Sequence, residues 1–353
     1  MNYGIKAAVL GLVGIGAAFL AIPMVFGFQK PMIETVQHGP RGVAMGLVYN
    51  DGDLAKTAAA NKVPTYLPKL PAVGPKASAV YKNVQVLGDL SVGQFTRLMA
   101  SVTQWVAPQQ GCNYCHNPAN LAEDSKYTKV VARRMLQMTQ NINQNWTQHV
   151  VATGVTCYTC HRGLNIPANV WTNATPAPGS DSGMGFAAMN FGIAHPTTVT
   201  QAAVASLPSD PFTPYLEGAQ NIRVQSTVAL PGTDRSSIQQ TDWTYALMMH
   251  MSSSLGVNCT YCHNSRAFSD WSQSPPQRVT AWYGIRMVRE MNNGYMDPLA
   301  PVFPDYRKGP MGDVAKVNCT TCHQGVYKPL YGVSMAKDFP ELQTVSSSAH
   351  PYP

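Results

Sequence analysis

Cys112-Asn113-Tyr114-Cys115-His116 is the first of four short stretches that share one pattern. The others are Cys157-Tyr158-Thr159-Cys160-His161, Cys259-Thr260-Tyr261-Cys262-His263 and Cys319-Thr320-Thr321-Cys322-His323. These motifs contain all eight cysteines of the chain. Cys-x-x-Cys-His is the attachment signature of haem c, in which both sulfurs form thioethers with the porphyrin and the histidine is an axial iron ligand. The pattern predicts four covalently attached haems c, with His116, His161, His263 and His323 as proximal ligands.

Paired cysteines have two other common uses in proteins. A single Cys-x-x-Cys could be a redox dithiol, and several pairs could hold zinc. Neither use requires a histidine directly after the second cysteine, whereas this chain has one in all four motifs. The haem interpretation is therefore the preferred one.

The N-terminal region has the composition of a membrane segment. Residues 7–28 carry no charge. As a helix they would span roughly 33 Å, which matches a hydrocarbon core of about 30 Å. A cleaved signal peptide, with small residues at 17–21, is the alternative. Because haem c is attached outside the cytoplasm, we expect residues 1–29 to form a transmembrane anchor with Lys6 on the cytoplasmic side.

Composition and charge exclude one broad class of partner. Charged residues make up only 12% of the 353 residues, and the formal net charge is +7. No basic run occurs, so we expect no nucleic-acid partner. Four haems would add roughly eight propionate charges, which would offset the positive balance.

The chain divides into six segments. Pro-rich and Gly-rich residues after the anchor predict an extended arm, and helical spacing begins near residue 85, where Ser91 and Gln94 form a capping box. A second helix is predicted over about 125–145. The predicted segments are an anchor (1–29), an arm (30–84), a first dihaem half (85–165), a connector (166–232), a second dihaem half (233–335) and a C-terminal tail (336–353).

The order helix, haem motif, helix, haem motif occurs twice. Leu98 and Met99 precede the first motif as Leu247 and Met248 precede the third. Arg134-Met135 and Arg286-Met287 stand in the same way before the second and fourth motifs. The predicted fold is mainly α with extensive coil, a multihaem cytochrome c with an internal two-fold repeat and an N-terminal transmembrane helix.

The sixth iron ligand decides what such haems do. Methionine or histidine there closes the iron and favours electron transfer, whereas an open position permits substrate chemistry. The histidines outside the motifs are His38, His149, His195, His250 and His350, too few in plausible places for four bis-histidine haems. Internal symmetry alone favours Met99, Met135, Met248 and Met287. Near neighbours remain alternatives: Met138 for Met135, and Met249 or Met251 for Met248.

The chain resembles a known family, the tetrahaem cytochrome c subunit of the photosynthetic reaction centre of purple bacteria. The resemblance covers about residues 30–335. It rests on the four motifs with their helix spacing, on the stretch from Arg41 to Met45, and on Pro276-Gln277-Arg278 followed by residues 281–287, Ala-Trp-Tyr-Gly-Ile-Arg-Met.

The resemblance implies a ligand set that differs from the symmetric one. It implies Met99, Met135 and Met248 as sixth ligands of the first three haems and His149 as the sixth ligand of the fourth. Met287 then becomes a core residue. It also implies that Arg278 lies beside the haem nearest the photochemical pigment, where a guanidinium could pair with propionates. Some family members begin at a lipid-bearing cysteine, which this chain lacks.

The function implied by the resemblance is electron transfer rather than enzyme catalysis. The four haems would re-reduce the photo-oxidised bacteriochlorophyll pair with electrons from a soluble cytochrome c or a high-potential iron-sulfur protein. The expected partners are the other reaction-centre subunits, with the haem domain on the periplasmic side of the inner, photosynthetic membrane. The family places the third haem (His263) nearest the pigment and the first (His116) farthest. Two alternatives are a membrane-anchored quinol dehydrogenase and a multihaem reductase with an open iron.

Overall fold

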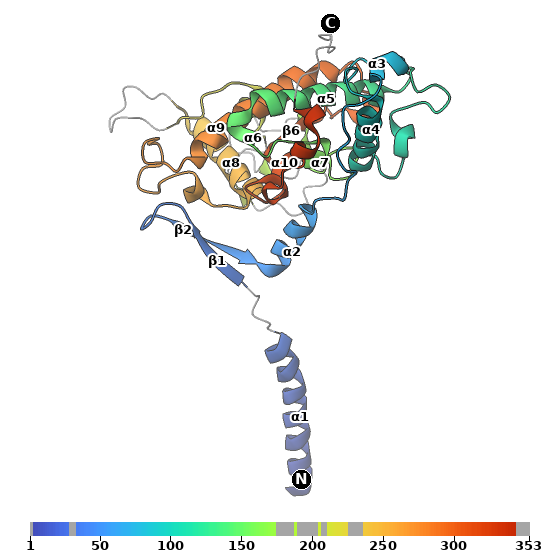
Figure 1. The fold of residues 1–353 in the computed structure, drawn as a ribbon. Helices are drawn as coiled ribbons and strands as arrows, with labels where there is room; N and C mark the ends of the chain where they lie inside the picture. The colour runs from blue at the N-terminus through green and yellow to red at the C-terminus, as the bar shows by residue number, and fades with distance from the viewer. Residues whose placement is uncertain are drawn as a thin grey trace.

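The computed structural model describes residues 3–27, 33–173, 187–188, 204–205, 210–224 and 236–343. The described part is mainly helical, with short two-stranded sheets (Figure 1). Helices of fifteen residues or more are α1 (Tyr3–Gly27), α4 (Val92–Val106), α5 (Tyr127–Asn145), α8 (Ile238–Leu255) and α9 (Gln277–Met291). Shorter helices are α2 (Asp51–Ala60), α3 (Ala77–Val80), α6 (Thr147–Val150), α7 (Cys157–His161) and α10 (Cys319–His323).

Helix α1 projects away from the other helices in Figure 1. The side chains described in it are those of residues 3, 4 and 6–22, and all of them are exposed. The N-terminal helix predicted from the sequence is therefore present. Among the residues that the structure describes, however, no helix combines the length and the hydropathy that crossing a membrane requires.

A β-hairpin follows α1 and underlies the helical body (Figure 1). Its strands β1 (Ile33–His38) and β2 (Met45–Asn50) pair antiparallel, and β2 leads directly into α2. Gly39, with φ 115°, brings the hairpin close to the third motif: a Cβ atom there would lie 2.3 Å from the carbonyl oxygen of Thr260. The segment 30–84 thus contains more regular structure than its composition predicted.

Hydrogen bonds join this hairpin to the third Cys-x-x-Cys-His motif. The Met45 amide donates to Thr260 Oγ1 at 2.9 Å, and Asn258 Nδ2 donates to the Met45 carbonyl at 2.7 Å. Tyr49 donates its hydroxyl proton to the carbonyl of Gly256 at 2.9 Å. The part of the chain nearest α1 is therefore attached to the third motif.

The helices before the motifs begin as their sequences predict. Ser91 caps α4 in a reciprocal capping box with Gln94, which confirms that prediction. Ser237 and Gln240 form the same box at the start of α8, and Gly256 ends that helix in the left-handed conformation. Each box satisfies amides that the first turn of a helix leaves unpaired.

Two clusters of buried side chains form the core. The larger joins α5, α8 and α9 with the π-helical turn Thr213–Glu217, and the smaller joins α4 with residues 330–342. Tyr215 and Leu216, in the predicted connector, and Phe339 and Leu342, in the predicted tail, are all 0% exposed. Parts of both segments therefore belong to the core, although neither shows a hydrophobic period. The short strands β3 (Val170–Trp171) and β6 (Lys316–Val317) also pair here.

Candidate haem sites

The four motifs adopt two local geometries. The first and third contain 3₁₀ turns, at Gly111–Tyr114 and Cys259–Tyr261. The second and fourth form the short helices α7 and α10, which begin with capping boxes and end in left-handed residues, Arg162 and Gln324. In backbone conformation the first motif therefore matches the third, and the second matches the fourth.

Each motif histidine makes the same type of hydrogen bond through Nδ1. The acceptors are backbone carbonyls at 2.8–3.0 Å: Leu121 for His116, Leu164 for His161, Phe268 for His263 and Val326 for His323. Because a carbonyl only accepts, Nδ1 must carry the proton, and the lone pair of Nε2 is left free. This arrangement is typical of histidines that ligate a metal.

His149, on α6, shares this geometry although it lies outside the motifs. Its Nδ1 donates to the Thr280 carbonyl at 2.9 Å, and its ring lies near that of His323, with ring centroids 6.0 Å apart and the two ring planes at 70°. When two imidazoles bind one metal ion from opposite sides through bonds of about 2 Å, their ring centroids lie roughly 6 Å apart. The spacing between His149 and His323 therefore fits two axial ligands of one haem iron.

Burial keeps both of these imidazoles neutral. It lowers the pKa of His323 to about 4, with a smaller contribution from the neighbouring His149. Burial also lowers the pKa of His149, and its hydrogen bond to Thr280 only partly opposes that shift. The neutral imidazole is the form that binds a metal, so the protonation states fit the predicted role.

The methionines fall into two groups. Met99, Met135 and Met248 are partly buried at the edges of the core clusters, on α4, α5 and α8. Met138 and Met287 are 8% and 6% exposed and pack inside the larger cluster. Met287 is thus a core residue, as predicted. Met138 is buried in the same cluster and is a core residue as well. Met249 and Met251 are about as accessible as Met248.

Arg278 lies close enough to the third motif for its charge to act on Cys262 and His263. Its guanidinium stacks on Trp271, with 4.0 Å from Cζ to the ring centroid, and it donates to Ser274 Oγ at 2.8 Å. Burial raises the pKa of Cys262 to about 11, and the charge of Arg278 opposes that shift. The residue therefore contributes positive potential at this motif.

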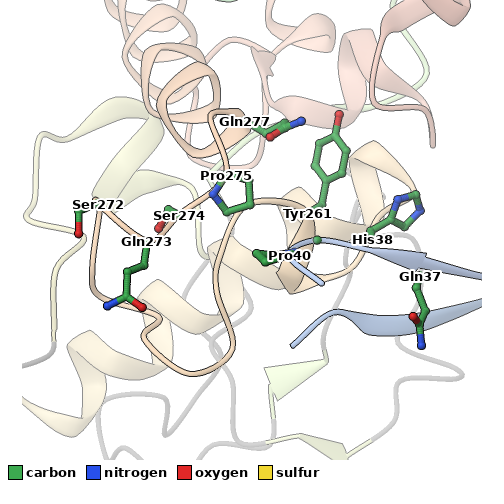
Figure 2. A pocket seen from close by; sticks show the side chains of 10 residues that line it. Gln37, His38, Pro40, Tyr261, Ser272, Gln273, Ser274, Pro275 and Gln277 are labelled. Atoms are coloured by element: carbon green, nitrogen blue, oxygen red, sulfur yellow. The ribbon is translucent and has the colours of Figure 1, made fainter. Parts of the chain in front are cut away.

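A pocket of about 510 Å³ opens next to the third motif (Figure 2). β1 supplies Gln37 and His38, the motif supplies Tyr261, and the segment before α9 supplies Ser274 and Pro275. His38 meets Tyr261 edge to face, with ring centroids 5.8 Å apart. The pocket thus lies between the hairpin and the segment that leads to Arg278.

The second and fourth motifs meet through their second cysteines. Cys160 and Cys322 are joined in the structure, with Cα atoms 4.5 Å apart. This disulfide differs from the prediction that each sulfur carries a haem, because one sulfur cannot be in a disulfide and a thioether together. The other six motif cysteines are free thiols. Burial raises the pKa of Cys157 and of Cys319 to about 12, so both are neutral.

Arg162 was missed by the sequence analysis. It follows His161 directly, and its Nη2 donates to the Cys322 carbonyl at 3.1 Å and to Asn61 Oδ1 at 3.2 Å. Its Nε and Nη1 are buried without a hydrogen-bond partner. A guanidinium with two unsatisfied donors between the second and fourth motifs fits an anionic group such as a haem propionate. Its position directly after a haem motif is the sequence feature that could have indicated this role.

Histidines held with Nε2 free beside paired cysteines, on a mainly helical fold, define a c-type cytochrome. The sequence profile of the family described as photosynthetic reaction centre cytochrome C subunit matches residues 29–343. The chain is 49% identical to the photosynthetic reaction center cytochrome c subunit of Rubrivivax gelatinosus, covering 99% of this chain and 93% of that one. It therefore belongs to the family of photosynthetic reaction centre cytochrome c subunits.

Two further relatives are also cytochromes c by name. The chain is 52% identical over 323 residues to the reaction center cytochrome c subunit of Thermochromatium tepidum, with 92% of this chain and 78% of the relative covered. Cytochrome c-554 of Chloroflexus aurantiacus is 28% identical over 310 residues, covering 72% and 71%. Family membership implies covalently bound haem c, electron transfer in photosynthesis and association with reaction-centre components.

Proposed function

We propose that this chain carries four haems c and re-reduces the photo-oxidised bacteriochlorophyll pair of a reaction centre. The electrons would come from a soluble cytochrome c or a high-potential iron-sulfur protein. The observation that carries the proposal is the shared Nδ1-to-carbonyl hydrogen bond of His116, His161, His263 and His323, which leaves Nε2 free at all four motifs. Haem c supplies one-electron redox chemistry when bound at such residues.

The proposed iron ligands are one histidine from each motif and one further side chain. The pairs are His116 with Met99, His161 with Met135, His263 with Met248 and His323 with His149. The 6.0 Å between the rings of His149 and His323 supports the last pair. Partial burial at the core edge supports the three methionines. The eight motif cysteines would hold the porphyrins by thioether bonds.

The two halves of the chain are proposed to be an internal repeat. The 3₁₀ turns of the first and third motifs and the capped helices of the second and fourth support this. The hydrogen bonds of the motif histidines support it as well. Their acceptors lie five residues on in the first and third motifs and three residues on in the others.

Helix α1 is proposed to hold the chain at the inner membrane, with the haem domain on the periplasmic side. Its large apolar side chains are exposed, among them Leu10, Leu12, Phe19 and Leu20 at 71–76%. Burying such a surface in lipid is favourable. The hairpin after α1 is hydrogen-bonded to the third motif, which supports the third haem as the one nearest the pigment. Arg278 there would raise that haem's potential.

The proposal is tested by removing the chain from the complex. We expect reaction centres that retain this subunit to re-reduce their pigment after a flash with no soluble donor added. Reaction centres that lack the subunit should stay oxidised until charge recombination. Identical recovery of the pigment in both preparations would show that another component supplies the electron.

A further inference from the structure

Gly284, near the middle of α9, is in direct contact with the ring of His149. A Cβ atom placed on Gly284 would lie 2.5 Å from Cε1 of His149, 2.8 Å from Nδ1 and 3.2 Å from Nε2. The first two distances are shorter than real carbon contacts allow. The imidazole therefore occupies space on this face of α9 that only glycine leaves free.

Backbone conformation does not explain a glycine at this position. Gly284 is not among the residues with positive φ, and α9 is helical on both sides of it. Glycine within a helix is disfavoured relative to alanine, because it loses more conformational freedom on folding. Close packing of another group against the helix is the remaining physical reason for it.

The imidazole of His149, which packs there, also makes a hydrogen bond to the same turn of α9. Thr280 lies four residues before Gly284, and its carbonyl accepts Nδ1–H of His149 at 2.9 Å. A helical carbonyl already accepts the amide four residues on, here that of Gly284, but it has a second lone pair. Without a side chain at Gly284, the imidazole can reach that lone pair from the side.

We propose that Gly284 is a positioning residue for the axial ligand His149. With the Thr280 carbonyl it forms a seat on α9 that receives the Nδ1–Cε1 edge of the imidazole and fixes the orientation of the ring. In this way Gly284 sets the potential of the haem at the fourth motif. The inference rests on the proposed function, because it requires His149 to be an iron ligand.

The first test is the variant Gly284→Ala in the intact complex, compared by redox titration with the parent. We expect one of the midpoint potentials to rise, because a displaced histidine donates less to ferric iron. The electron paramagnetic resonance signal of the same haem should change, and the other haems should keep theirs. The matched control is Gly93→Ala on α4, where a Cβ would be 3.8 Å from Leu70 Cδ1, an ordinary contact. Unchanged potentials in Gly284→Ala would overturn the inference.

A second test does not depend on how the crowded variant folds. His149→Ala removes the ring, so the added methyl of a His149→Ala/Gly284→Ala double variant has nothing to clash with. Free imidazole, followed by absorption spectra, should bind the haem of the single variant. It should bind the double variant at least about tenfold more weakly, the scale of effect seen when a ligand histidine loses its supporting partner. Equal affinities of the two variants for imidazole would show that Gly284 does not position the ring on α9.

The single variant also separates this inference from the proposed ligation. If His149→Ala leaves every potential and spectrum as in the parent, His149 is not a ligand, and both proposals fail. If His149→Ala alters one haem while Gly284→Ala alters none, the ligation stands and only the role of Gly284 is wrong.

Discussion

His149 and His323 lie with their ring centroids 6.0 Å apart, although 174 positions separate them in the sequence (323 − 149). Each donates Nδ1–H to a backbone carbonyl, His149 to Thr280 and His323 to Val326. The two imidazoles thus present free nitrogens in the same region, held by α9 on one side and by the fourth motif on the other.

The first prediction concerns Cys160 and Cys322, which are paired in the structure. In the protein isolated from its native membrane, we expect both sulfurs to carry thioether bonds to haem, because each is the second cysteine of a complete motif. Mass spectrometry of proteolytic peptides should find haem on all four motif peptides. A disulfide-linked pair of peptides containing Cys160 and Cys322 would mean that these two motifs do not bind haem in the predicted way.

The second prediction concerns Met248. Replacing it by histidine should keep the haem six-coordinate and lower one midpoint potential by on the order of 100 mV, within the roughly 0.8 V that axial ligands span. Histidine is the stronger donor to ferric iron, which is why the potential falls. Met287→Leu is the control, since Met287 packs in the core and its change should move no potential. Four unchanged potentials in Met248→His would point to Met249 or Met251 as the ligand.

The third prediction concerns attachment to the membrane. A chain without residues 1–29, exported by a cleavable signal, should appear in the soluble fraction when the other reaction-centre subunits are absent. The full chain expressed under the same conditions should sediment with membranes, because the exposed apolar side chains of α1 would be buried in lipid. Membrane fractionation compares the two. A truncated chain that still sediments would locate the attachment elsewhere.

The fourth prediction concerns the ion pair between Arg97 and Glu341, whose side chains are each 2% exposed. Removing one partner leaves a buried charge, so Glu341→Ala should lower the free energy of unfolding by about 3 kcal/mol. The control is Lys56→Ala, which removes the ion pair with Asp53, whose side chains are 82% and 73% exposed. This variant should change the free energy of unfolding by less than about 1 kcal/mol. Denaturant unfolding followed by circular dichroism measures both. Equal midpoints for the two variants would refute the difference.

Local patterns in the sequence predicted local structure well. Ser91 and Gln94 predicted a capped helix, and the structure has the reciprocal hydrogen bonds. Such signals depend on residues within one turn of each other, so they need no knowledge of the tertiary fold. The motif histidines are predictable for the same reason, since each sits beside its own cysteines.

Contacts between distant segments could not be predicted in this way. The role of Phe339 and Leu342 in the core, and the reason for glycine at position 284, depend on which elements pack together. No hydrophobic period marks residues 336–343, because they form 3₁₀ turns rather than a long helix. For His149, the resemblance to a family supplied what the residues alone did not.

The most direct test of electron transfer through this chain is time-resolved absorption after a single flash, in membranes poised so that only the high-potential haems are reduced. We expect a haem of this chain to be oxidised as the pigment is re-reduced, with matching kinetics. The first haem to be oxidised should be the one held by His263 and Met248, since methionine ligation raises the potential of a haem. Recovery of the pigment at a rate set only by the concentration of soluble donor, with no haem of this chain oxidised in between, would contradict the account.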